Sequence, residues 1–204
     1  ELGIADDTIV MYSTDNGAEV MSWPDGGTTP FRGEKATNWE GGWRVPCAIR
    51  WPGTIKPGTV LNGIGSHEDL LPTLLAAAGD PNVKQDAFEG RKKIGSTTYK
   101  AHIDGYNLIP WLSGETEESP RKEFLYWGDD GGLLALRYNN WKLVFQEQRA
   151  HGADVWEEPF VELRLPKLFN LRMDPFERAD HEGIGYWQWR LDRIYMLVPA
   201  QAYV

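Results

Sequence analysis

A carboxylate and an amide stand side by side at the end of a short apolar run, in the sequence Asp15-Asn16-Gly17. Further along the chain, Lys35 ends the glycine-bearing segment 31–35. Hard cations such as calcium take only oxygen ligands, roughly six to eight of them, and Asp15 and Asn16 supply about two or three. Lysine adds a compact positive charge that suits an anion. These residues therefore predict part of a site for a divalent metal ion and an anionic group.

The place of this pair in the expected fold favours a ligand site. Residues 8–14 are apolar on both sides, which is typical of a strand covered on both faces in an α/β protein. Ligands of open α/β sheets bind beyond the carboxyl ends of strands, where Asp15 and Asn16 lie. Two plainer interpretations stay open here, because Asp-Asn-Gly is a common turn sequence and Lys35 could be a solvated surface lysine.

The motif at residues 40–44 reads EGGWR and carries no reactive group that this chemistry demands. Glycine permits unusual backbone angles and the close approach of other segments. The acidic and basic side chains of the motif could brace the loop that aims Lys35. We therefore interpret four residues as structural support: Glu40, Gly41, Gly42 and Arg44. Residues 17–44 are rich in glycine and proline, which predicts a long functional loop.

The first half of the chain mixes strand and helix patterns. Residues 47–51 predict another short strand. Residues 66–79 predict a helix, with Asp69 as its N-cap and Gly79 as its stop signal. Residues 106–112 predict one or two helical turns. These patterns indicate an α/β arrangement in which the strand at 8–14 is one member of a sheet.

The second half has a different texture. Short apolar runs alternate with turn signals, and Asn139-Asn140 between two such runs indicates a tight hairpin. The predicted strands are 123–127, 133–138, 141–146 and 167–171. Because their connections are short, we expect an antiparallel meander. Apolar residues at helical spacing then predict a helix from Tyr186 to Pro199.

The predicted fold class is α/β: a partial sheet, followed by a small α+β domain with an antiparallel sheet and a C-terminal helix. The expected domains are residues 1–115 and residues 116–204. A two-stranded sheet is marginal in water, and the strand at 8–14 has one certain partner at most, near residues 47–51. Its open edges invite pairing, so we expect the chain to self-associate through this half.

Composition excludes several classes of protein. The 204 residues carry a net charge of −9, which argues against nucleic acid as a partner, because phosphate backbones recruit basic patches. No apolar run reaches the about 18 residues of a membrane span. The single cysteine, Cys47, excludes an internal disulfide framework and a cysteine-based zinc site.

The order of these motifs resembles the sulfatases of the alkaline phosphatase superfamily, and arylsulfatases in particular. The stretches that carry the resemblance are TIVMYSTDNGAE, FRGEKATNWEGGWRVPCAIRWPG, SHEDLLPTLLAAAG, DGYNLIPWLSGE, SPRKEFLYW, LRYNNWKLVF and KLFNLRMDPFERAD. The resemblance implies a sulfuric ester hydrolase. It implies that Asp15 and Asn16 bind a divalent metal, usually calcium, and that Lys35 contacts the sulfate of the substrate.

Sulfatases also need a Cys-x-Pro-x-Arg or Ser-x-Pro-x-Arg segment, whose first residue becomes the formylglycine nucleophile. Cys47 reads Cys-Ala-Ile-Arg-Trp and does not match it, and the pair Asp6-Asp7 lies at the wrong end of its strand to share a site with Asp15. We therefore expect the carboxyl-terminal portion of a sulfatase, without turnover of its own. The resemblance slightly favours a periplasmic or secreted location, and a cytoplasmic one stays open.

Two other functions stay open on the sequence. One is a phosphodiesterase or phosphonate hydrolase of the same superfamily, which the nucleophile segment would distinguish. The other is a non-catalytic binding or assembly module.

Overall fold

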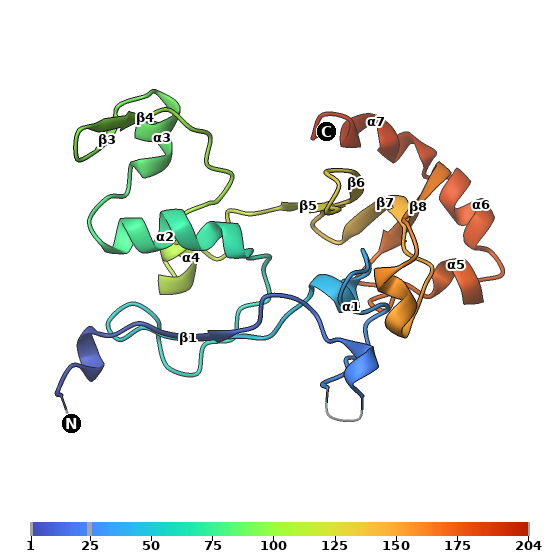
Figure 1. Ribbon diagram of the computed structural model, residues 1–204, viewed down its shortest axis with the longest axis horizontal. Coiled ribbons are helices and arrows are strands. Elements are labelled where there is room, and N and C mark those ends of the chain that lie inside the picture. Colours follow the sequence, from blue (N-terminus) through green and yellow to red (C-terminus); the bar gives the residue numbers. More distant parts are fainter. Residues whose placement is uncertain (1, 24–25, 204) are drawn as a thin grey trace. The chain divides into compact units, whose positions relative to one another are not determined.

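The computed structural model describes residues 2–23 and 26–203, which form two compact units (Figure 1). The first unit combines residues 1–11 with 48–122, and the second combines 12–47 with 123–204. The chain therefore passes from the first unit to the second and back before it ends in the second. The expected domains, residues 1–115 and 116–204, refer to the domains of a longer protein. This boundary stays a prediction.

The strand predicted at residues 8–14 is β1 (Val10–Ser13), and the strand predicted at 47–51 is β2 (Cys47–Arg50). Within the described part of the chain these two pair with each other alone. Val10 is 52% exposed and Tyr12 69%, so β1 is not covered on both faces as its sequence predicts. Among the described residues no strand other than β2 pairs with β1.

The first unit contains the predicted helix, which begins with a 3-10 turn. This turn is η3 (His67–Asp69), and α2 (Leu70–Ala77) continues it. The predicted helical turns after residue 106 form α4 (Ile109–Ser113). The remaining elements of this unit were not predicted: η1 (Ala5–Asp7), α3 (Val83–Phe88), and the hairpin of β3 (Lys92–Ile94) and β4 (Thr97–Tyr99).

A buried carboxylate organises the first unit. Asp69 is fully buried and accepts hydrogen bonds from the backbone amides of Ser66 and Tyr106, both at 2.8 Å. The guanidinium of Arg121, also buried, approaches the same carboxylate to 2.6 Å. Burying a charge is costly unless it is paired, so Asp69 links the start of the helix, the segment before α4 and the end of the unit.

The second unit contains the predicted meander as a four-stranded antiparallel sheet in the order β5-β6-β7-β8. The strands are β5 (Glu123–Trp127), β6 (Leu133–Tyr138), β7 (Trp141–Glu147) and β8 (Val161–Asn170). Asn139 has a φ of 51°, the left-handed conformation that a tight hairpin turn requires. The hairpin predicted at Asn139-Asn140 is confirmed.

Two core clusters pack against this sheet, one around Trp39 and one around Leu143 and Ala200. Trp39 packs with buried residues of the sheet, among them Tyr126, Val144 and Phe169. The indole of Trp39 meets the ring of Phe169 edge to face, with centroids 6.0 Å apart, a favoured aromatic geometry. The segment around Trp39 is therefore fixed by the sheet.

The helix predicted from Tyr186 to Pro199 is divided. It consists of α6 (Tyr186–Leu191), the 3-10 turn η5 (Ile194–Met196) and α7 (Leu197–Ala200), after the short α5 (Ala179–Glu182). Pro199 lies in the first turn of α7, where its missing N–H costs nothing. None of the helices in residues 2–23 and 26–203 has the length and apolar character needed to cross a membrane.

The predicted long loop at residues 17–44 is not wholly irregular. It contains the 3-10 turn η2 (Val20–Ser22) and the single-turn helix α1 (Glu40–Trp43). A further 3-10 turn, η4 (Gly152–Trp156), lies between β7 and β8. α1 contacts the turn that follows Asn16, and η2 and η4 both contact Glu34 in the segment that carries Lys35.

Candidate functional site

Asp15 and Asn16 directly follow β1, as the sequence predicts. Asp15 is exposed, and Asn16 is partly buried. The side-chain nitrogen of Asn16 donates to the carbonyl oxygen of Gly17 at 2.8 Å, so the other atom of that amide is an oxygen of the kind that calcium binds. The pair offers a carboxylate and an amide oxygen at neighbouring positions.

Close backbone packing holds this turn against the glycine motif. The amide of Gly17 donates to the carbonyl oxygen of Gly42 at 2.8 Å. A Cβ on Gly17 would overlap the carbonyl oxygen of Gly41 and lie 2.8 Å from the carbonyl carbon of Gly42. Real Cβ atoms do not come so near, so only glycine fits at position 17.

The loop that carries Lys35 joins the same cluster. Its backbone amide donates to the carbonyl oxygen of Ala18 at 2.9 Å. A Cβ on Gly41 would lie 2.5 Å from the carbonyl oxygens of both Arg32 and Gly33. Glycine at position 41 therefore lets the lysine loop and α1 touch. The structure brings the backbone segments of Asp15, Asn16 and Lys35 together in one unit.

Buried charges fix α1 to the sheet. Glu40 is 1% exposed and accepts hydrogen bonds from the hydroxyl of Tyr126 at 2.6 Å and from Arg137 at 2.9 Å. Lys142, fully buried in β7, lies 3.3 Å from the same carboxylate. Burial opposes ionisation of Glu40, but attraction to Lys142 and Arg137 outweighs it and lowers the pKa of this carboxyl.

A second buried carboxylate completes this cluster. Glu177 pairs with Lys142 at 2.8 Å and accepts a hydrogen bond from the backbone amide of Glu40 at 2.7 Å. Burial raises the pKa of Glu177, and the negative charge of Glu40 adds to this effect although Lys142 opposes it. The φ of Glu177 is 53°, an uncommon conformation for a residue other than glycine. The first amide of α1 is therefore held by a side chain far along the sequence.

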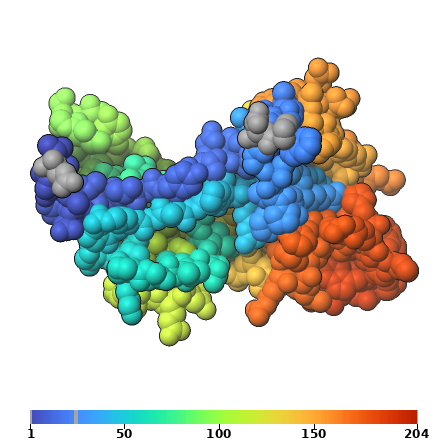
Figure 2. All heavy atoms as spheres, turned by 90° about the horizontal axis from the view of Figure 1, so that it is seen from below, coloured from blue at the N-terminus to red at the C-terminus, as the bar shows by residue number. Residues whose placement is uncertain are grey.

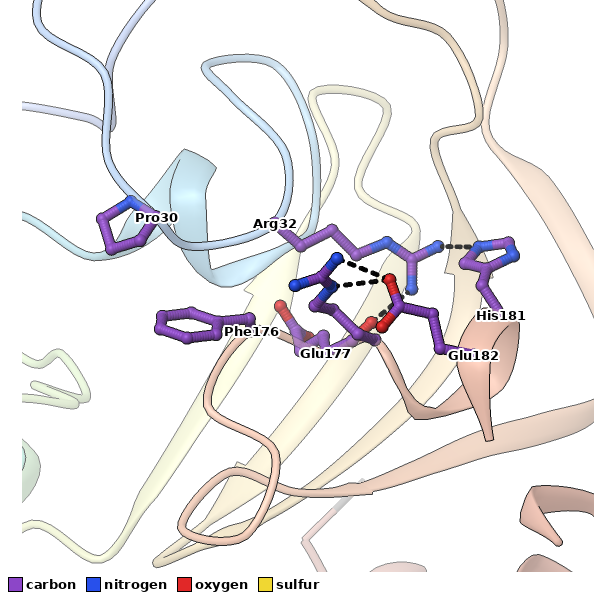
Figure 3. A pocket seen from close by; sticks show the side chains of 7 residues that line it. Pro30, Arg32, Phe176, Glu177, His181 and Glu182 are labelled. Carbon is purple, nitrogen blue, oxygen red and sulfur yellow. Dashed lines mark hydrogen bonds and ion pairs between the residues drawn. The ribbon is translucent and has the colours of Figure 1, made fainter. Parts of the chain in front are cut away.

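Two arginines hold the segment before Lys35. The guanidinium of Arg44 lies 4.4 Å from the ring centroid of Phe31. Arg32 donates to the carbonyl oxygen of Glu177 and to Asp180, each at 2.9 Å, and its other nitrogen lies 2.9 Å from His181. Figure 3 shows Arg32 reaching across a surface pocket toward His181. The guanidinium of Arg32 therefore has its partners within the protein and braces the loop.

The donors present fit part of a calcium site. Asp15 and Asn16 offer oxygen atoms, and calcium needs roughly six to eight. Across the described ranges, no cluster of three or more His, Cys, Asp or Glu side chains is placed to hold a metal ion. Within residues 2–23 and 26–203, His, Cys, Asp and Glu side chains therefore do not complete a calcium coordination shell around Asp15 and Asn16.

Sequence reasoning missed several residues around the site. Lys142 and Glu177 received no role, and neither did Trp156, whose ring centroid lies 5.6 Å from the ammonium nitrogen of Lys35. A lysine between apolar neighbours in a predicted strand is a signal that could have identified Lys142 as a buried, paired charge. Glu177 and Trp156 carry no comparable local signal.

Three comparisons bear on this geometry. Residues 1–80 match the family model described as Sulfatase. The chain is 33% identical to human arylsulfatase A over 195 residues, which is 90% of this chain and 35% of that protein. It is also 33% identical to human N-acetylgalactosamine-6-sulfatase over 229 residues, covering 98% of this chain and 40% of that protein.

The fold agrees with these sequence matches. The crystal structure of the PsFucS1 sulfatase from Pseudoalteromonas sp. aligns with a TM-score of 0.72 at 27% identity, over 97% of this chain and 37% of that one. The predicted fold class is confirmed by this similarity. The chain spans about a third of the length of the curated relatives it matches, 35% of one and 40% of another.

Proposed function

Since this chain belongs to the sulfatase family, we propose that it forms part of the metal- and sulfate-binding site of a sulfuric ester hydrolase of the arylsulfatase type. One observation supports this proposal above others. Backbone hydrogen bonds from Gly17 to Gly42 and from Lys35 to Ala18 join the predicted metal ligands to the predicted sulfate contact. Residues that serve one anion must share one small volume.

In this proposal Asp15 and Asn16 are ligands of a divalent cation, calcium by family resemblance. A bound calcium ion would supply positive charge that polarises the oxygens of a sulfate ester. The carboxylate of Asp15 contributes a full negative charge, and the amide of Asn16 contributes a neutral oxygen. By the same resemblance, a complete enzyme would take its formylglycine nucleophile from a segment other than those named here.

Lys35 holds the sulfate group in this proposal. Its side chain is partly buried, and its backbone is fixed by the bond to Ala18. An ammonium group donates up to three hydrogen bonds to oxygen, and such charge-assisted bonds are shorter and stronger than neutral ones. Because charge moves onto the leaving oxygen during cleavage, a fixed cation lowers the energy of the transition state.

The supporting role belongs to the motif at residues 40–44. Gly41 and Gly42 allow the three backbone segments to touch, and Glu40 ties α1 to the sheet. Arg44 stacks on Phe31 at the start of the lysine loop. These four residues act on the position of Lys35 and not on the substrate.

Nuclear magnetic resonance on the 204-residue chain tests the sulfate contact. Inorganic sulfate, added with and without calcium, should shift the amide signals of residues 15–17 and 33–36. Lys35→Ala should abolish these shifts, while Lys93→Ala, which removes an exposed lysine of the other unit, should leave them unchanged. Equal sulfate binding by wild type and Lys35→Ala would remove Lys35 from the site.

Activity gives a second test in a catalytically competent sulfatase that contains this sequence. There Lys35→Ala should lower kcat/KM by tens to hundreds of fold, because losing a charge-assisted contact in a transition state costs about 2–4 kcal/mol. Activity close to that of the unmodified enzyme would contradict the role of Lys35. Measuring sulfate and phosphate esters side by side would also separate a sulfatase from a phosphodiesterase.

A further inference from the structure

The segment between β7 and β8 lies along the loop that carries Lys35. The side-chain nitrogen of Asn38 donates to the carbonyl oxygen of Gln146 at 2.8 Å, and its oxygen accepts from the amide of Gln148 at 3.0 Å. The buried carboxylate of Glu34 accepts from the amide of Gly152 at 3.0 Å. Residues beyond β7 are therefore fixed against the residues on both sides of Lys35.

This arrangement places an aromatic ring beside the lysine. Trp156 ends η4, and its ring centroid lies 5.6 Å from the ammonium nitrogen of Lys35. The preceding residue, Val155, is 6% exposed and anchors the turn, while Trp156 itself stays 53% exposed. The apolar face of this indole is therefore accessible to a ligand, and it lies next to the ammonium group of Lys35.

More exposed apolar side chains lie in and directly after the turn η2. The turn η2 packs against η4, and Figure 2 shows the spheres of these two segments, blue and light orange, on the same face. Met21 is 54% exposed and Trp23 is 69% exposed. Isolated exposed apolar residues are normal, but neighbouring ones beside a polar site mark a binding surface.

The charge around the ring restricts what it can bind. Asp154, Glu157 and Glu158 are exposed in the same segment, and the whole chain carries a net charge of −9. A ligand with several sulfate or carboxylate groups would meet these like charges, which disfavours its binding. A ligand with one anionic group and an otherwise uncharged body would not.

We propose that Trp156, together with the exposed Met21 and Trp23 of the neighbouring segment, forms the subsite for the uncharged ring of a monosulfated ester whose sulfate is held at Lys35. This inference rests on the proposed function. A sulfate oxygen within roughly 3 Å of the ammonium puts the ester oxygen and the ring attached to it within reach of the indole. Both an aryl group and the flat face of a neutral sugar can stack there.

A comparison of ligands measures the contribution of the ring. Resonance titrations of the full chain would use inorganic sulfate, methyl sulfate, phenyl sulfate and glucose 6-sulfate. Phenyl sulfate should bind about fivefold tighter than methyl sulfate, the gain expected of one stacked aromatic pair. In Trp156→Ala this ratio should fall to about one, while the affinity for methyl sulfate stays. Comparing phenyl sulfate with glucose 6-sulfate shows whether an aryl group or a sugar is preferred.

A matched control uses another exposed tryptophan beside a cation. Trp187 is 59% exposed, and the guanidinium carbon of Arg190 lies 4.3 Å from its ring centroid. Trp187→Ala should leave the ratio of the two affinities unchanged. In the wild type, magnetisation transfer from phenyl sulfate should reach the indole of Trp156.

The outcomes separate the two proposals. Failure of both inorganic sulfate and methyl sulfate to bind would overturn the proposed function and this inference with it. Sulfate binding at Lys35 with an unchanged ratio in Trp156→Ala would overturn the subsite alone. Magnetisation transfer to other tryptophans, and none to Trp156, would also overturn the subsite.

Discussion

Gly17 lies directly against Gly41, so that a Cβ on Gly17 would overlap the carbonyl oxygen of Gly41 and sit 2.7 Å from its carbonyl carbon. These two glycines bring the turn after β1 onto α1. Backbone atoms form this contact on both sides, so no side chain can rotate away to make room. The contact explains why glycine stands in both motifs.

Gly17→Ala should therefore destabilise the second unit by about 3 kcal/mol, since overpacking of backbone is not relieved by a change of rotamer. Urea denaturation followed by tryptophan fluorescence would measure the loss. Gly27→Ala is the matched control, because a Cβ there meets open space. Equal stability of the two variants would mean that the turn can move away from α1.

The second prediction concerns acid. Lys167 pairs with Glu147 at 2.5 Å and with Asp180 at 2.7 Å. Burial opposes ionisation of both carboxyls, but hydrogen bonds from Lys167 outweigh it and hold their pKa values below the ordinary 4.5 and 3.8. A depressed pKa contributes stability above the unfolded pKa that is lost as pH falls through the folded one. The urea concentration at the midpoint of unfolding should therefore decrease once the pH falls below about 4.

Asp180→Asn is the test variant for this pH dependence. It removes one of the two depressed carboxyls, so the loss of stability below pH about 4 should be shallower. Glu177 acts in the opposite sense, because its raised pKa contributes stability that is lost as pH rises. An unchanged acid profile in Asp180→Asn would show that this ion pair does not contribute to folding.

The third prediction concerns metal. Because Asp15 and Asn16 supply only part of a calcium shell, the isolated chain should bind calcium more weakly than micromolar. Isothermal titration calorimetry measures this affinity. Micromolar or tighter binding that disappears in Asp15→Ala would show that the site is more complete than proposed.

The fourth prediction concerns catalysis. The chain has no segment that matches the formylglycine motif, so the purified 204-residue chain should not hydrolyse an aryl sulfate above background. A chromogenic aryl sulfate assay with calcium would measure turnover, with a mock purification as control. Calcium-dependent turnover found only in the purified chain would contradict the proposal that the nucleophile comes from elsewhere.

The fifth prediction concerns association. β1 is exposed along most of its length and pairs with β2 alone among the described strands. Open strand edges pair with other chains, so light scattering across a dilution series should show a dimer or larger species. Val10→Lys places a charge on this exposed strand and should favour the monomer.

A compact monomer at micromolar concentration, with residues 8–14 protected from hydrogen exchange, would contradict this prediction. It would mean that the chain covers β1 by itself. Equal association of Val10→Lys and wild type would place the contact elsewhere.

Local patterns allowed much of the second unit to be predicted. Alternating apolar residues and the Asn139-Asn140 turn specify the meander, because neighbouring strands joined by short turns must pair antiparallel. The helix after residue 66 was predicted from its local start and stop signals, Asp69 and Gly79. The division of residues 186–199 into three pieces was not, since helical spacing alone does not reveal where a helix breaks.

The sequence by itself determined the chemistry available at the site. A carboxylate, an amide and a lysine of fixed order, with glycines between them, indicated a metal ion and an anion and carried the family resemblance. Side-chain type decides which ligands are possible, and the order of motifs decides the family. Neither depends on distant parts of the chain.

Only the tertiary structure decided what holds and surrounds these residues. Glu40 lies between Lys142 and Arg137, and Lys35 lies beside Trp156. Each of these contacts joins positions far apart along the chain, and burial and pairing are properties of the packed sheet. The side chains that position the site and those that would contact the body of a substrate are therefore visible only once the chain is folded.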